Sequence, residues 1–524
     1  MGLVTLDAEK AFNRVWHERL FQKLYNDGIQ GNLWLLLRDL QANGSTKVKW
    51  NCNLSNQFQT MQGIRQGAKL STTLYKRYNN PLLQQIEEHN LGTNIGTTNV
   101  GAPTVADDIS MLPSNPVDTQ TMLQTVYNNA KQDKVKFNAS KSDVIIYNNP
   151  NSRKTEWEIG KDKIESSSST THLGLVREDN NKFDIQPKIQ VARRTMYSLM
   201  GAGLHGRRGL NPLTSYKIWE CFGLPRATYG LESIKLAKKD IDSLERYQRT
   251  LLRQLQSLPD RCAIIPVYTL LGAKPMEIVL DIKTLSFFTN MLRQRESIEF
   301  KIISRQLAVK GEESSSLTIS IRKILQKYDL PDAYDLIQNT PTKEKWKTMI
   351  KDATNKFYRK NILEEMESKT TLKYLAIQEN PLDEPHPIYK YIGPDPHDVE
   401  KAAIKARLLT GTYTLQTDKH RFNQYEVDKT CQLCNQEPED REHFILQCTV
   451  LTEVRQKYVP ELLELVPSEG TENEDLLQLI LDSTHEKLSP LKICKKNQQQ
   501  IEKISRNLLY ELHSQRTRVL ANRK

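Results

Sequence analysis

Two acidic positions, each next to a predicted strand, constrain the fold of this chain most. Gly2–Leu6 is a short, mostly apolar segment that predicts a strand, and it leads directly into Asp7. Asp107 and Asp108 form the only Asp-Asp pair in the sequence and separate two short apolar arms over 104–112, which predicts a β-hairpin. If these strands are neighbours in one sheet, the three carboxylates meet. From composition alone, a helix cap at Asp7 and an ordinary turn at Asp107-Asp108 remain the alternative.

The surrounding pattern mixes helices with strands. Apolar positions at helical spacing predict helices over 8–25 and 74–89, and 143–147 reads as a further strand. From about residue 186 onward the pattern is mostly helical. The proline-rich stretch 380–396 reads as a linker. We therefore expect an α+β fold that is followed by helical regions.

Charge and hydropathy limit the class of protein. Lys and Arg number 74 against 63 Asp and Glu, a net charge of +11, which favours polyanion partners. The 524 residues suggest two to four domains. No apolar run approaches the roughly 20 residues that span a bilayer, and no signal peptide is evident. We expect no membrane association and an intracellular location, in the cytoplasm, the nucleus or both.

Three of the seven cysteines cluster with one histidine. Cys431, Cys434, His443 and Cys448 follow the pattern C-x2-C-x8-H-x4-C. Four soft or borderline ligands suit a closed tetrahedral Zn²⁺ site with a structural role. The alternative is a chance cluster of buried thiols.

Five segments, in this order, resemble the palm motifs of non-LTR (LINE-type) retrotransposon reverse transcriptases. The likeness extends over about residues 1–275 and more loosely to 450. The zinc segment and the preceding Arg407–Gly411 also resemble the C-terminal region of that family. The five motif segments are Asp7–Val15, Gly63–Ser71, Val105–Asp108, Asn138–Ser142 and Thr171–Leu175.

The resemblance implies specific roles in a two-metal polymerase site. Asp7, Asp107 and Asp108 would hold two catalytic Mg²⁺ ions. Gln66 and Gly67 would contact the incoming nucleotide.

Two further positions carry an implied role beside an ordinary one. Phe12 would lie under the sugar and select deoxynucleotides, or else is a core residue of its helix. Lys141 would face the triphosphate, or else is a solvated lysine at a helix end.

The sequence also departs from the family pattern. Asn13, Thr72 and Val105 stand where the family usually has Asp, Pro and an aromatic residue. The fingers region that the family places before the first motif is mostly missing. We therefore expect an N-terminally truncated polymerase, whose own activity is an open question.

The expected domains follow from this likeness. They are a palm (1–180), a helical thumb (181–275), a helical connector (276–400), a CCHC zinc-knuckle-like module (401–455) and a charged helical tail (456–524). In the thumb, a group of basic side chains would bind nucleic acid by its phosphates, with a solvated helix face as the alternative. That group is Arg193, Arg194, Arg207 and Arg208.

The expected function is RNA-directed DNA polymerisation, a nucleotidyl transfer from dNTPs onto a primer 3′-hydroxyl. The partners would be an RNA template and a DNA primer or target DNA, and the sequence leaves the oligomeric state open. The alternatives are an inactive nucleic-acid-binding remnant of such an element and a scaffold protein with neither activity.

Overall fold

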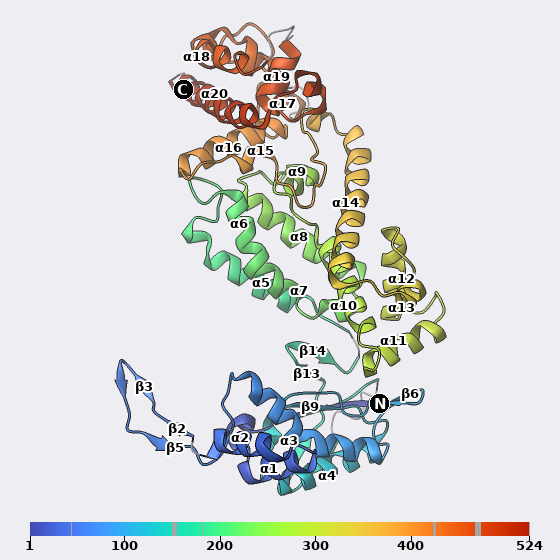
Figure 1. Cartoon of the computed structure of the whole chain (residues 1–524). Coiled ribbons are helices and arrows are strands. Elements are labelled where there is room, and N and C mark those ends of the chain that lie inside the picture. Colours follow the sequence, from blue (N-terminus) through green and yellow to red (C-terminus); the bar gives the residue numbers. More distant parts are fainter. Residues whose placement is uncertain (43, 149–154, 181, 423–425, 467–472, 523–524) are drawn as a thin grey trace. The chain divides into compact units, whose positions relative to one another are not determined.

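The computed structural model describes residues 1–42, 44–148, 155–180, 182–422, 426–466 and 473–522. The chain forms two compact units, whose elements are labelled in Figure 1. Unit 1 comprises Met1–Asp184 and Arg295–Val309, and unit 2 comprises Ile185–Gln294 and Lys310–Lys524. The expected mixture of helices and strands is confirmed. Among the described helices, none combines the length and the apolar character that crossing a membrane requires.

A four-stranded antiparallel sheet lies in unit 1. Its order is β10-β1-β9-β8, so β1 is an inner strand. All five residues of β1 are buried, which accounts for its mostly apolar sequence. The strand and the hairpin that the sequence predicts are both present. The strands are β1 (Gly2–Leu6), β8 (Thr104–Val105), β9 (Asp108–Met111) and β10 (Asp143–Ile146).

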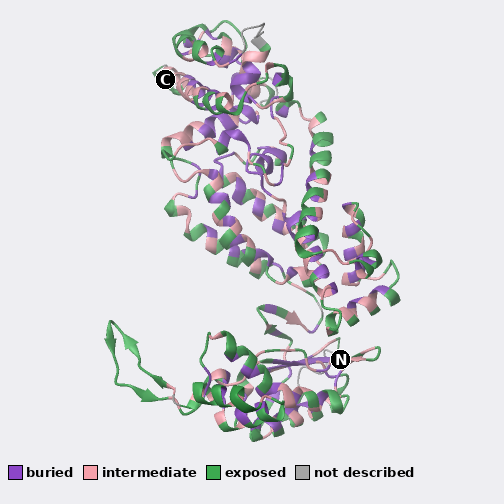
Figure 2. Cartoon of the chain, in the orientation of Figure 1, coloured by how far each residue is buried: buried purple, intermediate pink, exposed green. Residues whose placement is uncertain are grey.

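Four helices of unit 1 bury apolar residues in two clusters. Figure 2 colours the buried residues of the chain purple. Val4, Met111 and Met122 belong to the cluster that joins the sheet to α4. Leu20 and Tyr78 belong to the cluster that joins α1 to α3. These helices are α1 (His17–Asn26), α2 (Gly31–Ala42), α3 (Lys69–Glu88) and α4 (Pro116–Gln132). Unit 1 also contains α11 (Ile298–Val309), whose buried residues belong to neither cluster.

The single helix expected over 8–25 is broken in the structure. A short 3₁₀ helix, Ala11–Arg14, ends before Val15, and α1 begins at His17. The carbonyl oxygens of Phe12 and Val15 accept hydrogen bonds from the backbone N–H groups of Ile64 and Gly63, both at 2.8 Å. A continuous α-helix would use these carbonyls internally, so the contact with a distant loop replaces one helical turn.

Small two-stranded hairpins complete unit 1. The β2–β5 and β3–β4 pairs consist entirely of exposed residues. The pairs are β2 (Ser45–Thr46) with β5 (Phe58–Gln59), β3 (Lys49–Trp50) with β4 (Asn53–Leu54), β6 (Asn94–Ile95) with β7 (Thr98–Asn99), β11 (Glu156–Ile159) with β12 (Asp162–Glu165), and β13 (Ser169–His172) with β14 (Leu175–Glu178).

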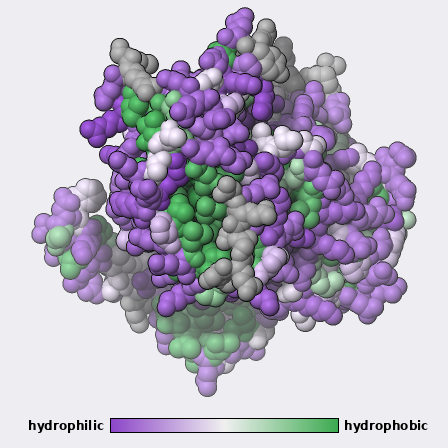
Figure 3. All heavy atoms as spheres, turned by 90° about the horizontal axis from the view of Figure 1, so that it is seen from above, coloured by the Kyte–Doolittle hydropathy of each residue, from purple (hydrophilic) through white to green (hydrophobic). Residues whose placement is uncertain are grey.

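Unit 2 is built mainly from helices, as its sequence predicts. Figure 3 shows the whole chain from above. Most side chains on this face are hydrophilic, and the hydrophobic ones gather in smaller groups. The helices are α5 (Gln186–Ser198), α6 (Pro212–Ile218), α7 (Leu224–Thr228), α8 (Lys238–Leu255), α9 (Ile264–Thr269), α10 (Met276–Leu292), α12 (Leu317–Lys327), α13 (Ala333–Gln338), α14 (Lys343–Glu367), α15 (Pro387–Lys390), α16 (Pro396–Leu409), α17 (Gln416–Phe422), α18 (Thr452–Leu463), α19 (Asn473–Leu481) and α20 (Lys495–Asn522).

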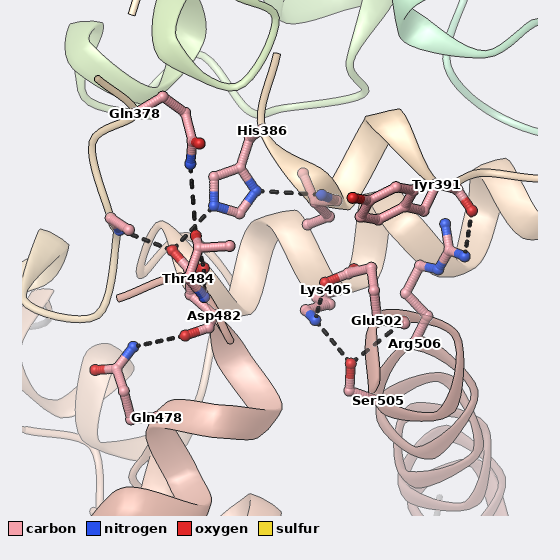
Figure 4. Close-up of polar contacts among 12 residues, drawn as sticks. Gln378, His386, Tyr391, Lys405, Gln478, Asp482, Thr484, Glu502, Ser505 and Arg506 are labelled. Atoms are coloured by element: carbon pink, nitrogen blue, oxygen red, sulfur yellow. Dashed lines mark hydrogen bonds and ion pairs between the residues drawn. The ribbon is translucent and has the colours of Figure 1, made fainter. Parts of the chain in front are cut away.

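Two buried polar pairs connect the C-terminal helices of unit 2 (Figure 4). The Lys405 ammonium donates to Glu502 at 2.8 Å and to Ser505 at 2.7 Å. The His386 Nε2 lies 2.9 Å from the Asp482 carboxylate. Charges buried this deeply need partners, so the first pair holds α16 against α20, and the second holds the start of α15 against the end of α19.

The stretch 380–396 differs from the linker that its prolines predict. Leu382, His386 and Tyr389 are almost fully buried within unit 2. Pro387 and Pro396 occupy the first turns of α15 and α16, where a missing N–H costs nothing. These two prolines therefore start helices rather than extend a linker.

Candidate active site and metal centre

The sheet register brings the acidic positions of unit 1 together. β1 and β9 pair antiparallel with Leu6 opposite Ile109, so one further residue along each strand places Asp7 opposite Asp108. The β8–β9 hairpin pairs Val105 with Asp108, which leaves Ala106 and Asp107 as its two-residue turn. The three carboxylates that the sequence singles out thus gather at one end of the sheet.

A contact from α3 fixes the hairpin tip. Ala106 has φ +57°, a left-handed conformation that is unusual for a residue with a Cβ. The Asn79 amide donates to its carbonyl oxygen at 3.2 Å. A strained turn held from outside is often a functional feature, and this one positions Asp107.

The electrostatics of this cluster favour a bound cation. Burial raises the pKa of Asp108, and the negative charges of Asp107 and Asp7 raise it further, against an opposing effect of His172. Within the described residues, none of the three carboxylates forms an ion pair with a Lys, Arg or His side chain. Adjacent carboxylates without a protein cation suit hard divalent ions such as Mg²⁺, so this donor set fits the expected metal.

The fourth motif segment, Asn138–Ser142, holds the backbone of Asp7 on both sides by hydrogen bonds, and we call these contacts the clamp. The Asp7 N–H donates to the Ser142 hydroxyl at 3.2 Å, and the Asn138 N–H donates to the Asp7 carbonyl at 2.9 Å. The Ser142 hydroxyl also donates to the Asn138 carbonyl at 2.9 Å. Lys141 lies exposed within this segment, one residue from the clamp.

The loop that begins at Gly63, in the second motif segment, is hydrogen-bonded to the segment that follows Asp7. His17 Nε2 lies 2.6 Å from the Gly63 carbonyl oxygen. Gly63 has φ +90°, and a Cβ there would lie 2.7 Å from the Asn13 carbonyl oxygen. Gln66 and Gly67 beyond it are exposed, with open space around the Gly67 Cα. The loop is therefore anchored at one end and open at the other, where a ligand could approach.

The surroundings of Phe12 combine a contact with the core and a ring that stays partly exposed. It is half-buried, packs against the apolar cluster of α1 and α3, and stacks on Tyr75 with 4.9 Å between ring centroids. The acidic cluster also affects Tyr75: burial raises the pKa of Tyr75, and the negative charge of Asp107 raises it further. The ring of Phe12 thus has a core contact on one side without being fully enclosed.

The four arginines predicted to bind nucleic acid lie in unit 2 and differ in their contacts. Arg193 and Arg194 are exposed on α5, and Arg193 lies over the Tyr197 ring at 5.3 Å. Arg207 is exposed in the loop after α5. Arg208 pairs with Glu400 at 2.7 Å, so part of its charge is already neutralised.

The four predicted zinc ligands do meet. The ligand atoms of Cys431, Cys434, His443 and Cys448 all lie within 4.8 Å of one another. The Cys431 and Cys448 sulfurs are 3.9 Å apart, and the Cys434 sulfur is 3.4 Å from His443 Nε2. Ligands around a tetrahedral Zn²⁺ would be separated by roughly 3.5–3.8 Å. The donor set and its spacing fit such an ion.

Neighbouring hydrogen-bond donors favour the thiolate form of one cysteine of this cluster. Hydrogen bonding from Cys448 and from the backbone N–H groups of Cys434 and Leu433 lowers the pKa of Cys431, against the opposing effect of burial. Thiolates are the metal-binding form of cysteine.

Sequence reasoning missed the residues that support the site rather than form it. Tyr75, Asn79 and His17 had no marker beyond their places in helical patterns, and their contacts cross between motifs. His172 was seen only as part of a motif; burial lowers its pKa, with Asp108 opposing the effect.

Comparison with known proteins agrees with this geometry. Residues 1–176 match the reverse transcriptase (RNA-dependent DNA polymerase) family. The match covers the sheet, the three carboxylates and the anchored loop. The reverse-transcriptase-like region therefore coincides with most of unit 1.

A curated relative extends the likeness into unit 2. The chain is 23% identical over 350 residues to the "RNA-directed DNA polymerase from mobile element jockey" of Drosophila funebris. That alignment takes in 64% of this chain and 36% of the relative. The chain thus spans little more than a third of the length of the relative that it matches.

Proposed function

We propose that this chain is an RNA-directed DNA polymerase of a non-LTR retrotransposon. The observation that carries the proposal is the β1–β9 register, because it sets Asp7 opposite Asp108 beside the hairpin tip at Asp107. The match of residues 1–176 to the reverse transcriptase family supports it independently. The substrates would be dNTPs, an RNA template and a primer 3′-hydroxyl on primer or target DNA.

The acidic cluster would hold the catalytic metals. Asp7, Asp107 and Asp108 would coordinate two Mg²⁺ ions, whose chemistry is to activate the primer hydroxyl and stabilise the leaving oxygen. The clamp on the Asp7 backbone and the contact on the hairpin tip would keep these carboxylates preorganised, so that little rearrangement is needed at the moment of reaction.

Exposed residues around the cluster would bind the nucleotide. Gln66 and Gly67 stand at the open end of the anchored loop, and Lys141 follows the clamp on Asp7. A lysine there would contact the triphosphate as a point charge. Phe12 would exclude a 2′-hydroxyl from the sugar site.

We propose the remaining organisation on the same likeness. Residues 1–180 would be a palm, 181–275 a thumb, 276–400 a connector, 401–455 a structural zinc module and 456–524 a tail. Arg193, Arg194, Arg207 and Arg208 would neutralise template–primer phosphates. The cluster of Cys431, Cys434, His443 and Cys448 would hold one structural Zn²⁺.

Primer extension tests the proposal. The full chain is incubated with an RNA template, an annealed DNA primer, dNTPs and Mg²⁺, beside Asp108→Asn and Asp107→Asn. Losing a metal-binding carboxylate removes several kcal/mol of transition-state stabilisation, so we expect extension to fall roughly a thousandfold or more. Asp39→Asn, on the exposed surface of α2, is the matched control and should extend normally.

The outcome separates the alternatives. A folded wild type that binds RNA in a salt-sensitive way without extending the primer would be a nucleic-acid-binding remnant of such an element. A folded wild type that neither extends nor binds would be a scaffold. Equal extension by wild type and Asp108→Asn would remove the acidic cluster from catalysis.

A further inference from the structure

An open cleft in unit 2 carries four arginines and no carboxylate among its lining residues. Its volume is about 900 Å³. Segments far apart in the sequence form it: the end of α5 and its loop, the residues after α8, α16 with the turn after it, and α20. We call it the basic cleft, and the residues that matter for its chemistry are Tyr197, Arg207, Arg261, Arg407, Tyr413 and Arg516.

Arg407 is held rigidly in the wall of this cleft. Its Nε and Nη2 donate to the Ser257 carbonyl oxygen at 3.0 and 2.7 Å, and Nη2 donates to the Ser257 hydroxyl at 3.0 Å. Ser257 directly follows the C-cap of α8 and has φ +54°, the left-handed conformation with which many helices end. Within the described residues, the Nη1 group of Arg407 has no acceptor. One edge of the guanidinium is therefore anchored and the other can take an anion.

Arg207 and Arg261 stand exposed at the mouth of the cleft. Arg207 Nε reaches the Ser257 hydroxyl at 3.4 Å, and Arg261 donates to the Thr412 carbonyl oxygen at 2.8 Å. The Arg207 loop rests on the end of α8 without spare room, because a Cβ on Gly206 would lie 2.6 Å from the Leu255 carbonyl oxygen. Both guanidinium groups are thus placed close to Arg407.

The positive charge of the cleft is not balanced by its own lining. Glu439 neutralises only Arg516, through a paired contact at 2.7 and 2.8 Å. Burial lowers the pKa of Arg407, and the nearby charges of Arg207 and Arg261 lower it further. A bound anion would relieve this repulsion.

An aromatic ring borders the cleft. The Tyr197 side chain is 37% exposed, and Arg193 lies against its ring at 5.3 Å. A basic groove beside an exposed ring is how proteins bind single-stranded nucleic acid, since phosphates need cations and every base can stack on an aromatic face.

We propose that the basic cleft binds a single-stranded nucleic-acid segment, with phosphates contacted by Arg207, Arg261 and Arg407 and a base stacked on Tyr197. The volume fits this ligand: at about 900 Å³ it lies near the top of the roughly 300–1,000 Å³ of pockets that enclose small ligands, which is enough for a nucleotide. The proposal rests on the proposed function only for the choice of nucleic acid as the polyanion. The cleft lies outside residues 1–176, so it is independent of the acidic cluster.

Oligonucleotide binding by the full chain tests the cleft. The probe is a fluorescent 12-nucleotide single strand, followed by anisotropy across a salt series without Mg²⁺ or dNTPs. Arg207→Glu should weaken binding about tenfold and reduce the salt slope by about 0.7 for each phosphate that the variant no longer neutralises. Arg359→Glu is the matched control: an equally exposed arginine of unit 2, on α14 and outside the cleft, whose reversal should change the affinity less than twofold.

The controls decide how each result is read. Arg207→Gln, a milder change, serves if thermal unfolding shows Arg207→Glu to be misfolded. Equal affinities for the Arg207 and Arg359 variants would overturn the proposal. A blunt duplex competing as well as the single strand would also overturn it. Asp108→Asn should bind the oligonucleotide normally. If the wild type does not extend a primer but still binds the oligonucleotide in an Arg207-dependent way, the polymerase proposal fails and the cleft proposal holds.

Discussion

Glu439 holds Arg516 through two parallel hydrogen bonds, from Nε at 2.7 Å and from Nη2 at 2.8 Å. The Glu439 side chain is 1% exposed and that of Arg516 is 11% exposed. Glu439 lies in the sequence between Cys434 and His443, whereas Arg516 belongs to α20. This pair therefore joins the Cys/His segment to the wall of the basic cleft. It connects the predicted metal centre to the proposed binding surface.

Removing one partner of that pair should destabilise unit 2. Glu439→Gln leaves Arg516 buried beside an uncharged amide, and breaking a buried pair in this way costs about 3–5 kcal/mol. Urea unfolding measures the loss. Glu400→Gln is the control, because its pair with the exposed Arg208 should contribute less than about 1 kcal/mol. Comparable losses in both variants would show that the buried pair has no special role.

The Cys/His cluster should bind one zinc ion per chain. Elemental analysis of the purified protein should find one equivalent of zinc, and Cys431→Ser/Cys434→Ser should hold none. Because a structural zinc contributes folding free energy, a chelator should lower the melting temperature of the wild type. Cys494→Ser, at an exposed cysteine outside the cluster, should change neither result. Zinc retained by the double variant would rule out this assignment.

Gly63 should tolerate no side chain. Gly63→Ala combines a left-handed backbone with a contact on the Asn13 carbonyl, which together should cost about 2–5 kcal/mol. Gly67→Ala shares the left-handed backbone, at φ +87°, but meets open space, so about 1–2 kcal/mol is expected. Thermal unfolding of both variants separates the steric clash from the conformation. If both lose the same stability, the tight approach to Asn13 carries no cost.

Phe12→Val separates a sugar-selecting role from a core role. If the ring excludes the 2′-hydroxyl, the smaller side chain should raise ribonucleotide over deoxynucleotide incorporation about tenfold or more. Removing the ring that stacks on Tyr75 should also cost about 1–2 kcal/mol of stability. Phe21→Val, in the same apolar cluster, should lose stability with an unchanged incorporation ratio. An unchanged ratio in both variants would leave Phe12 as a core residue.

Acid should destabilise the packing around Asp482. Burial alone would raise its pKa, but His386 and the hydrogen bonds from Thr484 and the Ala376 amide hold the pKa well below its ordinary value of 3.8. A carboxylate with a depressed folded-state pKa adds stability above the unfolded-state value, and this stability is lost as the pH falls toward the folded-state value. Urea unfolding between pH 7 and pH 3 should therefore show a smaller stability gap between wild type and Asp482→Asn at the acid end. Asp242→Asn, on the exposed face of α8, should follow the wild type throughout.

The sequence predicts those parts of the fold that local patterns specify. A short apolar run predicted β1, and two apolar arms around Asp107-Asp108 predicted the hairpin. The spacing of the Cys/His residues predicted a cluster whose members do meet. Each of these depends on neighbours within some 20 residues.

Local sequence patterns do not predict contacts between residues that lie far apart in the chain. The break before α1 depends on hydrogen bonds from Gly63 and Ile64, about fifty positions later, and no local signal marks them. The basic cleft gathers arginines from four separate segments, so helical periodicity shows each one only as a surface charge. The buried His386 lies among prolines that, by composition, indicated a linker.

The membership of α11 in unit 1 affects how the protein can be dissected. This helix lies in the sequence between two helices of unit 2, yet it packs against β7. A fragment that stops at residue 184 would keep the whole match to the reverse transcriptase family and lack Arg295–Val309. Such a fragment would expose a surface that the intact chain covers. An autonomous version would need that helix restored, by fusion or as a separate peptide.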